Sequence, residues 1–106
     1  MSQTPEGKVK DRIKKVLDAR KPRLYYDMPV PSGYGKSMLD FVGAFCGHAF
    51  AIEAKAGRKK PTERQEGTRE DMSKAGIMVF CINEFDGWDA LDRWIAAIEE
   101  YEACNT

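Results

Sequence analysis

The sequence is poor in the residues that hold small secreted or zinc-stabilised domains together. Its 106 residues include only 3 cysteines and 1 histidine, and no C-x-x-C pair. Because the cysteines (Cys46, Cys81 and Cys104) are odd in number and far apart, neither a disulfide framework nor a structural zinc site is expected. Reduced cysteines that serve in packing fit a cytoplasmic protein. His48 is expected in a turn, without a catalytic role.

Long apolar segments are also absent. No stretch approaches the roughly 20 apolar residues needed to span a membrane. The charged N-terminal residues MSQTPEGKVKDRIKK are not followed by the apolar segment of a signal peptide. With 42% hydrophobic and 32% charged residues, the chain is typical of a globular protein rather than a disordered one. We therefore expect a single cytoplasmic domain over residues 1–106.

The chain has no net charge, but its charges are unevenly distributed. Residues 1–60 carry 13 Lys and Arg against 6 Asp and Glu, a net of +7, whereas residues 61–106 carry 4 against 11, a net of −7. Such asymmetry between halves indicates a surface that binds a polyanion. Two ordinary solvated helices of opposite sign would give the same distribution, and this alternative stays open.

The first half of the chain begins with a helix and continues with strands. A hydroxyl N-cap, a proline and an acid at Thr4-Pro5-Glu6 open a helix that runs to about Ala19. Residues 23–28 form a short strand candidate, and the prolines and glycines of residues 29–37 predict a loop. From residue 38 to residue 55 apolar and polar residues alternate around a turn at Cys46-Gly47, which predicts a β-hairpin.

The second half predicts a helix, a strand and a helix. Thr62 and Gln65 fit a capping box at the start of an unusually polar helix to about Ala75. The apolar run 77–82 is typical of a strand covered on both faces. A last helix opens near Asp86 or Gly87. This order predicts an α/β protein with a mixed central sheet, in which the strands on either side of the polar helix are parallel.

The hairpin brings two acids together. A turn at Cys46-Gly47 places Asp40 directly opposite Glu53, where like charges destabilise a sheet. A divalent cation between the carboxylates would remove that cost, and Mg²⁺ prefers such hard oxygen ligands. Lys55 projects from the same strand face as Glu53. The hairpin therefore predicts a metal site with a lysine beside it.

The acid-x-Lys spacing alone is weak evidence, because about one or two such triplets are expected by chance in a chain of this composition. A second one, Glu6-Gly7-Lys8, lies at the start of the first predicted helix. Glu53-Ala54-Lys55 differs from this second triplet because it lies on a predicted strand and has an acid, Asp40, on the opposite strand. A solvated hairpin face without any site is the alternative.

Four segments carry a resemblance to a known family. They are Ser37-Met38-Leu39-Asp40, residues 47–50, Ile52-Glu53-Ala54-Lys55, and Lys60-Pro61-Thr62-x-x-Gln65. Together they resemble the PD-(D/E)XK nuclease superfamily and, within it, the small stand-alone, phage-like form of the virus-type replication-repair nuclease (VRR-NUC) family. The likeness extends from Glu6 to about Ile82, and Leu39 replaces the proline that usually precedes the first acid. It implies a restriction-endonuclease-like αβββαβ core, followed here by a C-terminal helix.

The resemblance also implies roles for individual residues. Asp40, Glu53 and the backbone carbonyl of Ala54 would bind Mg²⁺ or Mn²⁺, and Lys55 would orient the hydrolytic water. Gln65 and Glu6 match an active-site glutamine and an acid on the first helix. Each has an alternative: Gln65 is explained as a capping-box residue, and Glu6 as an acid at the positive end of a helix.

Basic and polar residues on the two loops beside this site are candidates for DNA phosphate contacts, although each could equally be a solvated loop residue. They are Lys36, Ser37, Arg58, Lys59 and Lys60, with Tyr34 as a further candidate. Gly35-Lys36-Ser37 is not the end of a phosphate-binding P-loop, because Val30 stands where the earlier glycine is required.

The expected function is that of a Mg²⁺- or Mn²⁺-dependent DNA endonuclease acting on branched DNA such as Holliday junctions. The resemblance implies a homodimer, which would place two sites on a two-fold symmetric substrate. The last helix, with Trp88, Trp94 and Tyr101, would supply part of the dimer interface or only cover the sheet. A non-catalytic nucleic-acid-binding module and a protein-docking module are the alternatives. A phage-encoded protein would act in the host cytoplasm.

Overall fold

The computed structural model describes residues 4–30, 39–57, 60 and 62–104. Within them the chain forms three helices and four strands: α1 (Pro5–Asp18), β1 (Leu24–Asp27), β2 (Phe41–Phe45), β3 (His48–Ala54), α2 (Glu63–Lys74), β4 (Met78–Ile82) and α3 (Trp88–Cys104). The predicted α/β class and the predicted element order are confirmed. Among these helices, none is long and apolar enough to cross a membrane.

The strands form one mixed sheet in the order β1-β2-β3-β4. The pairs β1–β2 and β2–β3 are antiparallel, whereas β3 and β4 are parallel and are connected through α2. The parallel pairing is as predicted, because a helical crossover returns the chain in its original direction.

The β2–β3 hairpin has the predicted turn and register. Cys46 and Gly47 adopt φ angles of 49° and 84°. Two consecutive residues with positive φ are typical of a type I′ turn, whose twist matches that of the flanking strands. Phe41 lies opposite Ile52, and Phe45 lies opposite His48. Continuing this register by one residue brings Asp40 to the level of Glu53.

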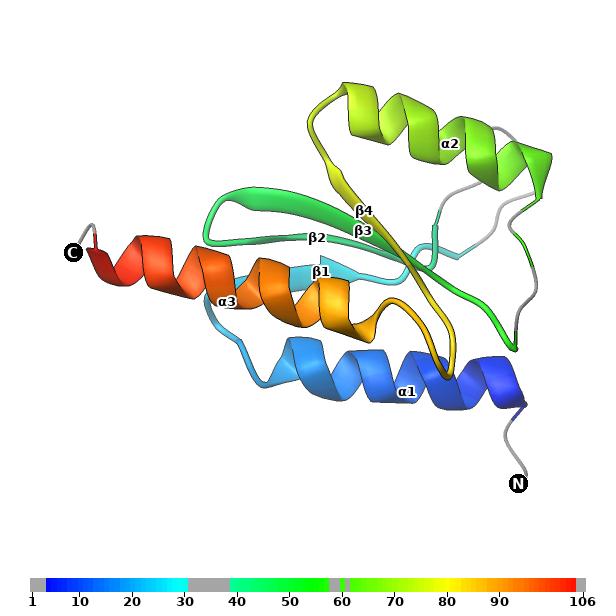
Figure 1. The fold of residues 1–106 in the computed structure, drawn as a ribbon, viewed down its shortest axis with the longest axis horizontal. Helices are drawn as coiled ribbons and strands as arrows, with labels where there is room; N and C mark the ends of the chain where they lie inside the picture. The colour runs from blue at the N-terminus through cyan, green and yellow to red at the C-terminus, as the bar shows by residue number, and fades with distance from the viewer. Residues whose placement is uncertain (1–3, 31–38, 58–59, 61, 105–106) are drawn as a thin grey trace.

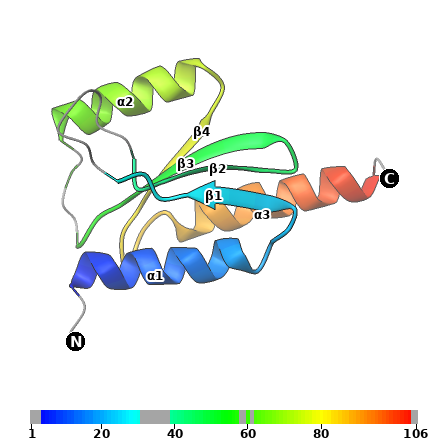
Figure 2. The ribbon, with the colours of Figure 1, turned by 180° about the vertical axis from the view of Figure 1, so that it is seen from behind.

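One face of the sheet carries the hydrophobic core. The helices α1 and α3 lie on this face, and α2 lies on the other (Figures 1 and 2). The indole ring of Trp94 in α3 lies 5.5–6.4 Å from the rings of three phenylalanines on the sheet, measured between centroids. The buried side chains of this core come from α1, all four strands and α3: Val9, Ile13, Leu17, Leu24, Phe41, Phe45, Phe50, Ile52, Ala54, Phe80, Ile82, Leu91, Ile95 and Ile98.

The opposite face is covered by α2, which has no buried residue of its own. Its N-terminus is held by the predicted capping box, in which both reciprocal hydrogen bonds are present. A helix without an apolar face depends on such end contacts and on polar contacts with the sheet.

Two local predictions were wrong. β2 begins at Phe41 rather than at residue 38, and His48 is the first residue of β3 rather than part of the turn. β4 is covered as predicted, by α3 on one face and by α2 on the other, although Met78 at its start remains 45% exposed.

Candidate metal and phosphate site

The predicted site residues come from the ends of four elements. Asp40 directly precedes β2, and Glu53 and Lys55 lie at the end of β3. Gln65 belongs to the first turn of α2, and Glu6 to the first turn of α1. The first turns of both helices lie at the end of the molecule where β3 terminates (Figures 1 and 2).

Glu53 is the only residue with a charged or polar side chain that is buried among those described, with 2% of its surface exposed. Its Oε1 accepts a hydrogen bond from Gln65 Nε2 at 2.7 Å and lies 3.5 Å from Lys55 Nζ. Its Oε2 is also buried but has no hydrogen-bond partner among the described residues. An unpartnered buried carboxylate oxygen is costly, so it indicates a position that a further ligand would fill. The alternative of a solvated hairpin face is wrong for Glu53.

The two oxygens of Asp40 have different partners. Oδ2 accepts a hydrogen bond from the backbone N–H of Ala54 at 2.8 Å, and Oδ1 lies 3.3 Å from Lys10 Nζ. The next N–H along β3, that of Lys55, donates to Ile82 of β4. Since the N–H and C=O of one strand residue point to the same side and alternate along the strand, the carbonyl of Ala54 is directed to the side on which Asp40 lies.

Burial raises the pKa of Glu53 to about 7, and the negative charge of Asp40 adds to that shift. The nearby ammonium of Lys55 opposes it. A cation that contacts both carboxylates would offset the repulsion that Glu53 experiences from Asp40. This electrostatic arrangement is what the opposed acids of the hairpin predict.

Gln65 is the predicted capping-box residue and also contacts Glu53. Its Oε1 accepts from the backbone N–H of Thr62 at 2.9 Å, which completes the capping box of α2. Its Nε2 donates to Glu53 at the same time. One amide group therefore caps the helix and orients the buried carboxylate, and the capping bond determines which end of the amide faces Glu53.

Glu6 approaches the site through a residue that the sequence analysis missed. Its Oε2 lies 3.7 Å from Lys10 Nζ, and the same ammonium contacts Asp40. The signal that could have identified Lys10 is its spacing, because residues four apart share one side of a helix. Lys10 thus links the acid of α1 to the acid at the start of β2.

The oxygen atoms of Asp40, Glu53 and the Ala54 backbone are hard ligands that suit Mg²⁺ or Mn²⁺. Among the described residues, no group of three or more His, Cys, Asp or Glu side chains is arranged to hold a metal ion. The predicted ligand set does not require three such side chains, since it combines two carboxylates with a main-chain carbonyl. The observation that supports a cation among these ligands is the buried Oε2 of Glu53, which has no hydrogen-bond partner among the described residues.

Most of the predicted phosphate contacts lie outside the described residues: Lys36, Ser37, Arg58, Lys59 and the further candidate Tyr34. Lys60 is described and is exposed to solvent. Three residues before it in sequence, the N–H of Gly57 donates to both carboxylate oxygens of Glu84, at 2.8 and 3.1 Å. Glu84, two residues after β4, therefore holds the backbone at Gly57.

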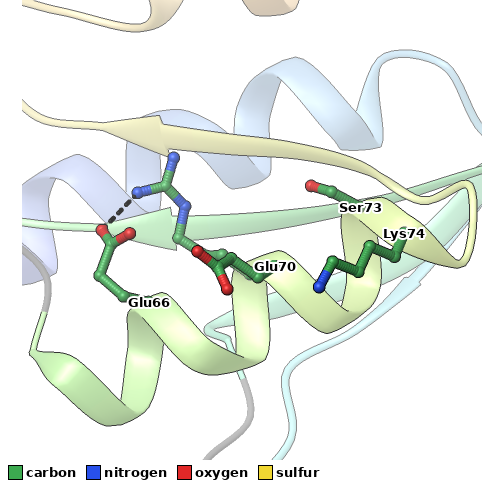
Figure 3. A pocket seen from close by; sticks show the side chains of 5 residues that line it. Glu66, Glu70, Ser73 and Lys74 are labelled. Atoms are coloured by element: carbon green, nitrogen blue, oxygen red, sulfur yellow. Dashed lines mark hydrogen bonds and ion pairs between the residues drawn. The ribbon is translucent and has the colours of Figure 1, made fainter.

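A groove lies along α2. It is lined by Glu66, Arg69, Glu70, Ser73 and Lys74, and the guanidinium of Arg69 is paired with Glu66 at 2.9 Å (Figure 3). None of the predicted site residues lines this groove. The candidate site is therefore a different place, at the start of β2 and the end of β3.

No protein-family model, curated protein or solved structure matches this chain. A functional assignment therefore depends on the chemistry of the residues at the end of the hairpin. The resemblance of four short motifs to a nuclease family remains a prediction.

Proposed function

We propose that this protein is a metal-dependent DNA endonuclease of the VRR-NUC type. The observation that carries the proposal is the buried carboxylate of Glu53, which has one unpartnered oxygen and lies beside Asp40 and Lys55. A structural acid would have both oxygens hydrogen-bonded or exposed to solvent. The combination of two acids and a lysine suits the hydrolysis of a phosphodiester.

The fold supports the same proposal. The described elements run helix, three strands, helix, strand, helix, which is the order that a restriction-endonuclease-like αβββαβ core with an added C-terminal helix requires. Fold alone does not imply function, so the site residues carry the argument.

In the proposed mechanism, Asp40, Glu53 and the Ala54 carbonyl hold a divalent cation. Such a cation supplies polarisation of the phosphate and a lowered pKa of bound water. The ammonium of Lys55, whose side chain is only 14% exposed, donates hydrogen bonds to the attacking water or to a phosphate oxygen. Gln65 keeps Glu53 in one orientation, so that its second oxygen remains available.

The proposed substrate is DNA, and branched DNA such as a Holliday junction is the form that the family resemblance favours. The net charge of +7 over residues 1–60, which include the hairpin and its loops, suits a phosphate backbone. Lys60, together with Lys36, Ser37, Arg58 and Lys59, is proposed to contact phosphates. A symmetric homodimer would place two such sites on two strands.

The test is cleavage of labelled four-way junction, flap and duplex DNA with and without Mg²⁺ or Mn²⁺. We expect metal-dependent cleavage that falls by about 100-fold or more in Asp40→Asn, which loses a ligand of the cation, and in Lys55→Met, which loses the donor to the attacking water or phosphate. Asp92→Asn and Lys74→Met are matched controls, since both residues are exposed and lie outside the site.

The outcomes separate the proposal from its alternatives. Binding of junction DNA without any cleavage would instead identify a nucleic-acid-binding module and overturn the enzyme assignment. Cleavage at the wild-type rate in Asp40→Asn would leave the activity but exclude this site.

A further inference from the structure

The two oxygens of Asp40 are not equally available to a ligand. Oδ2 is held at 2.8 Å by a backbone N–H, that of Ala54, which the pairing of β3 with its neighbours keeps in position. Oδ1 faces the ammonium of Lys10 at 3.3 Å. Because a backbone donor is rigid and a lysine side chain is not, Oδ1 is the oxygen that can exchange its partner.

Lys10 has a second anionic partner close by. Its Nζ lies 3.7 Å from Oε2 of Glu6, one turn earlier on α1. The side chains of Lys10 and Glu6 are 30% and 39% exposed, so the ammonium is not locked in place by packing. Its flexible four-carbon stem allows a small movement from Asp40 towards Glu6.

The other lysine of the site is placed differently. Lys55 contacts Oε1 of Glu53, the oxygen that Gln65 already holds, and leaves Oε2 without a partner. Lys10 instead contacts the oxygen of Asp40 that the backbone leaves free. Of the two lysines, Lys10 therefore lies where a cation would bind.

We infer that Lys10 is an internal competitor for the metal site and that Glu6 receives its ammonium when a divalent cation binds. This inference rests on the proposed function, because it concerns the same pair of acids. Two positive charges within about 4 Å of each other repel strongly in a partly buried place. Lys10 must therefore leave Oδ1 before that oxygen accepts a divalent cation, and this exchange sets the metal concentration at which the site fills.

The test measures Mn²⁺ binding without DNA, by titration calorimetry or from the electron paramagnetic resonance signal of free Mn²⁺. We expect Lys10→Met to bind Mn²⁺ about fivefold more tightly than the wild type, or better, because it removes the competing ammonium. The matched control is Lys14→Met, one turn further along α1, where the lysine pairs with Asp11 at 3.9 Å. Its removal should change the affinity by less than about twofold, since screening by solvent weakens more distant charges.

A double-mutant cycle distinguishes the movement of the Lys10 ammonium from Asp40 to Glu6 from a general effect of the Glu6 charge on the cation. Glu6→Gln should weaken Mn²⁺ binding in the wild-type background, because Lys10 then loses its second partner. The same change should have a smaller effect in the Lys10→Met background. Equal effects of Glu6→Gln in both backgrounds would overturn the exchange.

The remaining outcomes distinguish this inference from the proposed function. If Mn²⁺ binds the wild type, is lost in Asp40→Asn, and binds Lys10→Met no more tightly, the competition is wrong while the nuclease proposal stands. If no variant shows binding that depends on Asp40, both are wrong.

Discussion

The two faces of β3 differ in the kind of side chain that is buried on each and in the helices that cover them. Phe50, Ile52 and Ala54 point to the face covered by α1 and α3, where the contacts are apolar and every one of these side chains is buried. Ala51 and Glu53 alternate with them and point to the other face, where Glu53 contacts Gln65 of α2. There the buried groups include a carboxylate, and the covering helix has no buried residue.

This difference separates a stabilising face of β3 from a face that carries a destabilising buried charge. Apolar burial on the first face is favourable in proportion to the area removed from water. A buried carboxylate with an unpartnered oxygen on the second face costs free energy of folding. The first face therefore stabilises a structure in which the second can retain a destabilising group, as the proposed site requires.

The largest expected effect is on the apolar face. Phe50→Ala should lower the free energy of unfolding by about 3–5 kcal/mol, because Phe50 is fully buried and its ring packs against Trp94. Val79→Ala, on the half-buried opposite face, is the comparison and should cost about 1 kcal/mol. Chemical denaturation measures both. Similar losses at the two positions would contradict the division between the faces.

The next effect is a gain rather than a loss of stability, and it concerns Glu53. Its pKa in the folded protein is about 7, above the ordinary value of 4.5, so the folded state binds its proton more tightly than the unfolded state does. Stability contributed by this group is therefore present below pH 4.5, is lost as the pH rises towards 7, and stays lost above it. Glu53→Gln should thus stabilise the metal-free protein at pH 8 by about 3 kcal/mol.

The measurement is chemical denaturation of the metal-free protein at pH 4 and pH 8, in the presence of a chelator. The difference between wild type and Glu53→Gln should shrink towards zero at the lower pH. Glu100→Gln, an exposed position on α3, is the control and should show no such dependence. A stability difference that does not vary with pH would mean that burial of Glu53 does not shift its pKa.

The smallest effect tests the two ends of the Gln65 amide. Gln65→Ala removes both the capping bond to Thr62 and the hydrogen bond to Glu53, and should cost about 1 kcal/mol. Gln65→Glu keeps an acceptor for the capping bond but faces a second carboxylate across from Glu53. Its cost should therefore be larger at pH 8 than at pH 5, where Glu53 is protonated. Denaturation at both pH values checks this, and an equal cost would show that Gln65 serves only as a cap.

The hairpin was predictable because its signals are local. The turn at Cys46–Gly47 determines the register, and the register brings Asp40 to the level of Glu53. The capping box of α2 was predictable for the same reason, since its two members are three residues apart. The predicted start of β2 was too early because the alternation of apolar and polar residues does not show where pairing with the next strand begins.

The sequence by itself determined the elements, their order and the face of β3 that carries Glu53, because these depend on periodicity and on turns a few residues long. Only the tertiary structure decided that Glu53 is buried with one oxygen unpartnered, that Gln65 reaches it, and that Lys10 occupies the free oxygen of Asp40. These contacts join residues from different elements. They depend on how α1 and α2 pack against the ends of the strands, which no local pattern specifies.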